Sequence, residues 1–111
     1  MIVCVPVSPD GAVDPRWGRA SRLAIARLAG GRIVSWEEHD VAWDALHDIG
    51  TAGGHHARVA RFLQDHGVQV VVAGHMGPPM VQMLGTMRIV AKLGADGDAR
   101  AAVEAMAPLE H

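Results

Sequence analysis

Histidines and arginines occur in three separated, glycine-containing stretches of the chain. Arg16 and Arg19 stand on either side of Trp17-Gly18, and a later stretch reads Gly53-Gly54-His55-His56. Gly74-His75-Met76-Gly77 adds one more imidazole. Imidazole is a ligand for soft or borderline metals, and arginine holds anions through forked hydrogen bonds. These residue types predict a site for a metal or for an anionic ligand.

Each candidate also has a plainer interpretation, which the sequence leaves open. The glycines before His55 could simply turn the chain and leave both neighbouring histidines in solvent. His75 could hydrogen-bond a loop carbonyl, and Arg19 could pair with Asp14 to hold its own loop. Trp17 could either cover a pocket or fill the core.

Cys4 is the single cysteine, which excludes an internal disulfide and an all-cysteine zinc or iron–sulfur cage. It stands between Val3 and Val5, so we predict a buried cysteine that packs as a small hydrophobic residue. A metal or cluster held by this chain would therefore depend on other side chains.

Hydrophobic periodicity predicts the elements that position these residues. Five apolar segments are typical of strands, at residues 2–5, 23–28, 32–37, 68–73 and 88–91. Gly30-Gly31 predicts a hairpin between the second and third. Helices are expected to begin near His55, at Pro78, and after Asp96 or Asp98. This order predicts an α/β fold, a five-stranded mixed sheet flanked by about three helices.

Ligands of open α/β sheets bind beyond the carboxyl ends of the strands, where the strand order reverses. We therefore expect residues 7–20, 50–56 and 74–78 to meet at one rim of the sheet. The hypothesis of a common binding site fails if these three segments lie on opposite sides of the molecule.

Length and charge limit the classes of function. The 111 residues suit one domain, which we place at residues 1–108, and Leu109-Glu110-His111 resembles the start of an expression tag. Ten Lys and Arg against twelve Asp and Glu give no basic surface for nucleic acid. No apolar run is long enough to span a membrane. We expect a cytoplasmic protein that is a monomer or a homodimer.

Two longer motifs carry a resemblance to a known family. One is Val13-Asp14-Pro15-Arg16-Trp17-Gly18-Arg19, and the other is Gly67-Val68-Gln69-Val70-Val71-Val72-Ala73-Gly74-His75-Met76-Gly77-Pro78. With Gly53-Gly54-His55-His56 between them, the chain resembles the dinitrogenase iron–molybdenum cofactor biosynthesis family (the NifX, NafY-core and NifB C-terminal type of domain) over residues 1–106. It departs from the family in having Trp17 where phenylalanine is usual, and His75 where a small or acidic residue is common.

The resemblance implies a ribonuclease H-like fold and a non-enzymatic protein that binds or carries an anionic metal–sulfur cluster, iron–molybdenum or related, or its precursor. It also implies cluster donor and acceptor proteins as partners. Together with the residues above, it makes His55, His56 and His75 candidate metal ligands. Candidate cluster- or anion-binding residues are Arg16, Trp17, Arg19, Gly53, Gly54, Gly74 and Gly77.

Two other functions remain to be weighed. One is a regulatory module that binds a small anion on the same rim without metal. The other is a nuclease or phosphoryl-transfer enzyme on a ribonuclease H-like scaffold. That chemistry requires clustered carboxylates to hold magnesium ions, and the first predicted strand, Ile2-Val3-Cys4-Val5, has none.

Overall fold

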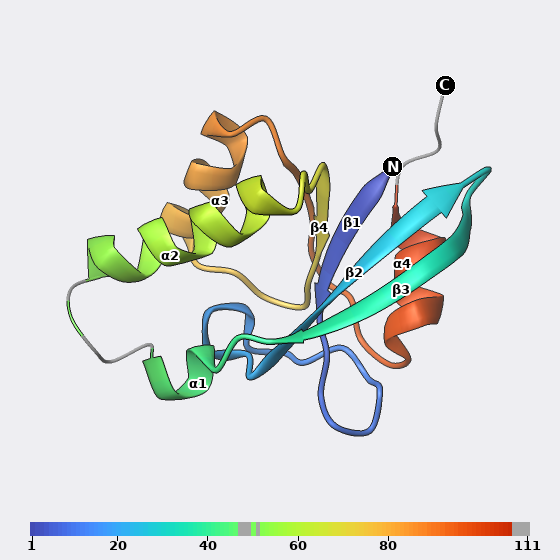
Figure 1. The fold of residues 1–111 in the computed structure, drawn as a ribbon, viewed down its shortest axis with the longest axis horizontal. Coiled ribbons are helices and arrows are strands. Elements are labelled where there is room, and N and C mark those ends of the chain that lie inside the picture. The colour runs from blue at the N-terminus through green and yellow to red at the C-terminus, as the bar shows by residue number, and fades with distance from the viewer. Residues whose placement is uncertain (47–49, 51, 108–111) are drawn as a thin grey trace.

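A computed structural model of the chain describes residues 1–46, 50 and 52–107. Within these residues, five strands form one mixed sheet in the order β3-β2-β1-β4-β5 (Figure 1). The strands are β1 (Ile2–Pro6), β2 (Arg22–Ala29), β3 (Arg32–Asp40), β4 (Val70–Val72) and β5 (Val90–Lys92). The predicted five-stranded mixed sheet is confirmed. The three residues assigned to a tag lie outside the described part of the chain.

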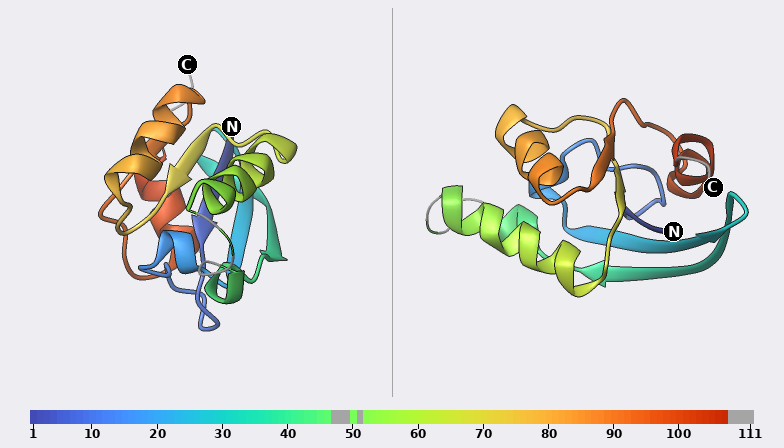
Figure 2. Two further views of the ribbon diagram at one scale, coloured as in Figure 1. Left: turned by 90° about the vertical axis from the view of Figure 1, so that its left-hand side faces the viewer. Right: turned by 90° about the horizontal axis from the view of Figure 1, so that it is seen from above.

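The sheet combines an antiparallel hairpin with parallel crossovers. β2 pairs antiparallel with both β1 and β3, whereas β1 pairs parallel with β4, and β4 with β5. Gly30 and Gly31 have φ of 59° and 78°, as a tight two-residue hairpin turn requires. The predicted hairpin is therefore confirmed, and it extends well past the short strands β4 and β5 (Figure 2).

The described helical elements follow the expected order with two additions. They are the 3₁₀ turn η1 (Trp17–Arg19), α1 (Trp43–Leu46), α2 (Ala52–Asp65), α3 (Pro78–Thr86) and α4 (Ala99–Met106). Three of them, α2, α3 and α4, are the predicted helices, whereas η1 and α1 were not predicted. Of the two candidates, Asp98 caps α4 by accepting a hydrogen bond from the Ala101 N–H at 2.9 Å.

The start of α2 differs from the prediction. We expected a helix that begins near His55 after a glycine loop, but α2 begins at Ala52 and includes Gly53 and Gly54 in its first turn. Glycine has a low helix propensity, so the sequence pattern alone favours a loop at these positions.

Helices cover both faces of the sheet (Figures 1 and 2). One core lies between the sheet and the helices α2 and α3, and includes Cys4, Leu63, Val71 and Leu84. The other lies between the sheet and α4, and includes Val3, Val5, Val70, Val72 and Val103. Alternate residues of β1 and β4 thus face opposite cores, which explains why both strands are apolar throughout.

Cys4 is completely buried in the first of these cores. Burial raises the pKa of its thiol well above the ordinary value, because a thiolate there would be desolvated. The prediction of a core cysteine is confirmed. None of the described helices is long and apolar enough to cross a membrane.

Candidate functional site

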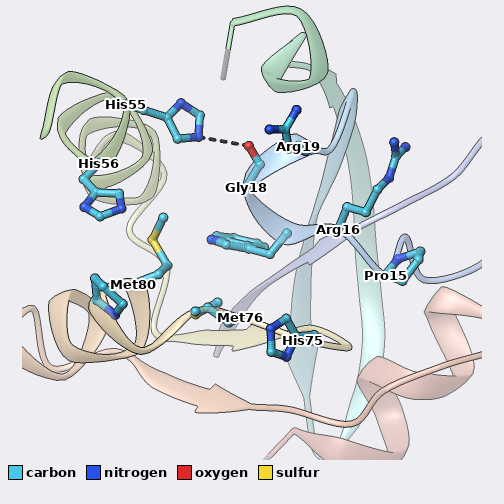
Figure 3. A pocket seen from close by; sticks show the side chains of 12 residues that line it. Pro15, Arg16, Gly18, Arg19, His55, His56, His75, Met76 and Met80 are labelled. Carbon is cyan, nitrogen blue, oxygen red and sulfur yellow. Dashed lines mark hydrogen bonds between the residues drawn. The ribbon is translucent and has the colours of Figure 1, made fainter. Parts of the chain in front are cut away.

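The three expected segments meet at one pocket of about 370 Å³ beyond the ends of β1 and β4 (Figure 3). The first wall is the loop after β1, the second is the start of α2, and the third is the loop after β4 with the start of α3. The lining residues are Pro15, Arg16, Trp17, Gly18, Arg19, His55, His56, His75, Met76, Gly77, Pro79 and Met80. Arg16, His55 and His75 therefore lie around one pocket and not on opposite sides of the molecule.

The first and third walls are joined through the backbone. Arg16 and His75 form an isolated parallel β-bridge. The buried carboxylate of Asp14 orients this loop by accepting hydrogen bonds from the Arg16 backbone N–H at 2.9 Å and from Arg16 Nε at 3.4 Å. The plainer interpretation of Arg19 paired it with Asp14; the ion pair that Asp14 makes among the described residues is with Arg16. The side chain of Arg16 is 61 % exposed, so its terminal nitrogens are accessible to a ligand.

Trp17 both lines the pocket and fills the core, so the two interpretations of this residue are both correct. It is 2 % exposed, and its ring packs edge-on against Trp43 with 5.5 Å between the ring centroids. Met76 and Met80, which also line the pocket, are buried beside it. The indole Nε1–H of Trp17 has no hydrogen-bond partner among the described residues.

His55 connects the wall made by α2 to the wall made by η1. Its Nε2 lies 2.9 Å from the Gly18 carbonyl oxygen, which can only accept, so this nitrogen carries the proton. Arg58 donates a hydrogen bond to the other ring nitrogen, Nδ1, at 2.9 Å. Both nitrogens are therefore occupied, and in this conformation the 3 % exposed His55 has no lone pair for a metal. This geometry argues for a structural role and against the expected ligand role.

His56 and His75 remain as the accessible imidazoles of the pocket. His56 is half-buried on α2, and His75 is exposed on the loop after β4. Among the described residues, no three His, Cys, Asp or Glu side chains come together as a metal site. A cluster that already has its own sulfide ligands could use one or two imidazoles, whereas a bare ion would lack a full ligand set.

The four candidate glycines have different positions. Gly53 and Gly54 are exposed in the first turn of α2 and are not among the described residues that line the pocket, so their role in anion binding stays a prediction. Gly74 also lies outside the lining, and serves close packing: a Cβ there would lie 3.1 Å from the Ala95 carbonyl oxygen and 3.6 Å from Pro15 Cα. Gly77 lines the pocket as the N-cap of α3.

The start of α3 offers an anion a dipole but few donors. Pro78 and Pro79 occupy its first two positions and carry no N–H. The next two N–H groups, of Met80 and Val81, are bonded to the Gly77 carbonyl at 3.1 Å. The helix dipole still favours negative charge here, but the hydrogen bonds to an anion have to come from side chains.

The charge of the lining is one-sided. The described residues around the pocket include two arginines and three histidines, and no Asp, Glu or Cys. Figure 3 shows His55 and His56 on α2 and His75 on the opposite wall, while the guanidinium groups of Arg16 and Arg19 extend away from His75. The sequence pointed to Asp14 as a residue that holds its loop, although with Arg19 and not Arg16 as the partner. Sequence reasoning missed Arg58, which orients His55.

The fold and the pocket define an α/β protein with a pocket at the carboxyl end of a mixed sheet, whose described lining includes arginines and histidines. A family model described as dinitrogenase iron-molybdenum cofactor matches residues 1–108, so the chain belongs to that family. The resemblance found in the sequence is confirmed. Among proteins of curated function, no sequence matches the chain significantly.

Solved structures with the same fold include the following two. The crystal structure of PH0822 has a TM-score of 0.76 at 20 % identity, and the match covers 95 % of this chain and 87 % of that one. The apo form of the orange protein from Desulfovibrio gigas has a TM-score of 0.75 at 25 % identity, covering 98 % of this chain and 92 % of that one.

Proposed function

We propose that this protein binds and carries an anionic metal–sulfur cluster, iron–molybdenum or related, or a precursor of one. Membership of the family and the likeness to the orange protein support a cofactor-binding or carrier role. The observation that carries the proposal is the pocket itself, which is lined by two arginines and three histidines without a described carboxylate or thiol. Such a lining favours an anion whose metals are already coordinated.

The cluster would be held mainly by electrostatic attraction. Arg16 and Arg19 line the pocket and would supply forked donors. The 61 % exposed side chain of Arg16, which extends away from His75, would turn toward a bound anion (Figure 3). His56 and His75 supply one imidazole from each facing wall, and Trp17, Met76 and Met80 supply an apolar floor. Few direct ligands make release to an acceptor easier than thiolate coordination would.

A small-anion module without metal is the second candidate. It is supported by the lack of a three-ligand group among the described residues and by the occupied nitrogens of His55. We do not propose a nuclease or phosphoryl-transfer enzyme, because the described pocket lining has no carboxylates to hold magnesium.

The proposal extends to the fold family, the cellular location and the partners of the protein. We propose a ribonuclease H-like fold, supported by the strand order β3-β2-β1-β4-β5, in which β2 alone among the described strands runs antiparallel. We also propose that the protein works in the cytoplasm, as a monomer or a homodimer, between cluster donor and acceptor proteins and without nucleic acid or membrane.

The test is a titration of the purified protein with tetrathiomolybdate, followed by its visible absorption, with inorganic phosphate in a parallel arm. We expect saturable binding of the thiomolybdate that weakens about 10-fold or more when Arg16 and Arg19 are replaced by Ala, since each charge-assisted hydrogen bond contributes about 1.5–3 kcal/mol. The charge-matched control replaces Arg27 and Arg32, which are exposed on the β2–β3 hairpin.

Three outcomes separate the candidates. Binding that is sensitive to Arg16 and Arg19, and also to the double variant His56→Ala and His75→Ala, supports a cluster carrier. Binding of phosphate alone favours the small-anion module. Equal weakening by the pocket and hairpin variants contradicts both, because it would reflect net charge and not a site. Metal and sulfide analysis of protein isolated from its own cell then identifies the natural cargo.

A further inference from the structure

Among its described residues, the pocket contains one buried donor without an acceptor. Trp17 is 2 % exposed and lines the pocket, and its indole Nε1–H has no hydrogen-bond partner among the described residues. The other two tryptophans serve as comparison. Trp36 donates its Nε1–H to Glu38 Oε2 at 2.9 Å, and the Trp43 nitrogen is not among the described unpartnered buried atoms.

An orphaned donor in a folded protein is costly. Leaving a buried polar group unpaired costs about 1–3 kcal/mol, and buried tryptophan nitrogens usually find a partner. Indole N–H is a donor and never an acceptor, so the missing partner must be an acceptor atom. None of the described residues supplies one, and the thioether sulfurs of Met76 and Met80, which line the same pocket, are weak acceptors.

The charge of the pocket indicates which acceptor would enter. Arg16, Arg19 and the imidazoles favour a negatively charged occupant, and a hydrogen bond to a charged acceptor is about twice as strong as one to a neutral acceptor. An anion whose outer atoms are oxygens or sulfides carries such acceptors on every side. Once the Arg16 side chain turns toward the pocket and the indole nitrogen is uncovered, such an anion would contact both groups.

Resting on the proposed function, we infer that the Trp17 indole N–H is the donor that recognises a terminal oxo or sulfido atom of the bound metal anion. Trp17 is thus a specificity-determining residue and more than a packing residue. Its nitrogen is covered in the structure, so binding requires a small movement of the lining. Met76 and Met80 are suited to that movement, because methionine is unbranched and has three rotatable bonds.

The decisive experiment follows the indole N–H resonances of the ¹⁵N-labelled protein by NMR during titration with tetrathiomolybdate and, separately, molybdate. The chain has three tryptophans, so there are three such signals, and Trp17→Phe identifies one of them. We expect the Trp17 signal to shift downfield on saturation while the Trp36 signal stays in place. This measurement uses the wild-type protein and does not depend on the folding of a variant.

Affinity gives the second measurement. Trp17→Phe keeps an aromatic ring and removes the donor, and we expect it to weaken binding of the preferred anion by about 10-fold to 100-fold, the loss of one hydrogen bond to a charged acceptor. Trp36→Phe, on the β2–β3 hairpin, is the control and should leave affinity unchanged.

The outcomes distinguish the two proposals. Suppose that the wild type binds and that the Arg16 and Arg19 variants bind more weakly. If Trp17→Phe then binds as well as the wild type, and the Trp17 signal of the wild type does not move, the donor role is overturned and the carrier proposal stands. If the wild type binds neither anion, both proposals are overturned. A shift of the Trp17 signal together with weaker binding by Trp17→Phe supports both.

Discussion

Replacing His55 by Ala should destabilise the protein without acting primarily on ligand affinity. The ring makes two hydrogen bonds at 2.9 Å, one to the Gly18 carbonyl and one from Arg58, and its edge packs on Trp43 with 5.9 Å between centroids. Two net hydrogen bonds at about 0.5–1.5 kcal/mol each, together with an aromatic contact of about 0.5–1.5 kcal/mol, predict that the free energy of unfolding falls by about 1.5–4.5 kcal/mol.

The matched control is the neighbouring His56→Ala. Both substitutions place Ala in the same helix, so the gain in helix propensity is the same in the two variants. His56 is half-buried, and we expect its replacement to change the free energy of unfolding by less than about 0.5 kcal/mol, as for surface positions. The two variants thus separate the effect of the His55 contacts from that of removing any histidine.

The assay is urea unfolding at pH 7, with the slope and the midpoint fitted for each variant. The expected result is a lower midpoint for His55→Ala at an unchanged slope, which indicates a change in stability alone. Equal midpoints for the two variants would refute the reasoning, because they would mean that the bonds to Gly18 and Arg58 contribute nothing. His56→Ala should in turn weaken binding of the thiomolybdate while leaving stability intact.

Two further predictions concern the packing around the site. Gly74→Ala should destabilise the fold by about 1–3 kcal/mol through overpacking, because the new Cβ would lie 3.1 Å from the Ala95 carbonyl oxygen. Gly77→Ala should be tolerated, because the nearest atom to its Cβ is Pro79 Cδ at 3.9 Å. Thermal unfolding of both variants checks this prediction. Cys4 should not react with a thiol reagent until the protein unfolds. Burial raises the pKa of the Cys4 thiol above the ordinary 9.0, so the unfolded state releases this proton at a lower pH than the folded state does. The stabilisation from the buried, protonated thiol is therefore complete below pH 9 and declines above it. Urea unfolding at pH 8 and at pH 10 tests this.

Local patterns in the sequence were sufficient to predict most of the sheet. The Gly30-Gly31 turn, the valines of β4 and the proline start of α3 each have a local physical cause, so the hairpin, the buried strand and the helix follow from nearby residues. The start of α2 was mispredicted for the same reason. Gly53 and Gly54 locally disfavour a helix, and the stabilising contacts of α2, such as those of Val59 and Leu63 with the core, are tertiary.

The position of the candidate site could be predicted from the sequence, but the hydrogen bonds within it could not. The topology of an α/β sheet brings the loops after β1 and β4 together, so Arg16 and His75 were expected on one rim. The role of His55 depends on the Gly18 carbonyl, 37 residues earlier in the chain, and no spacing rule indicates that contact. The choice of Arg16 over Arg19 as the partner of Asp14 depends likewise on the loop conformation that accompanies η1.

The paired prolines at the start of α3 have a consequence for how tightly the site can hold its occupant. Each proline restricts the backbone of the unfolded chain as well as that of the folded one, so less conformational entropy is lost when this segment becomes ordered. Because proline fixes φ, the backbone of the wall that carries Gly77 and Pro79 has fewer conformations available to it. Binding of an anion then costs little free energy for ordering this wall of the pocket, so fewer direct contacts are needed for a given affinity.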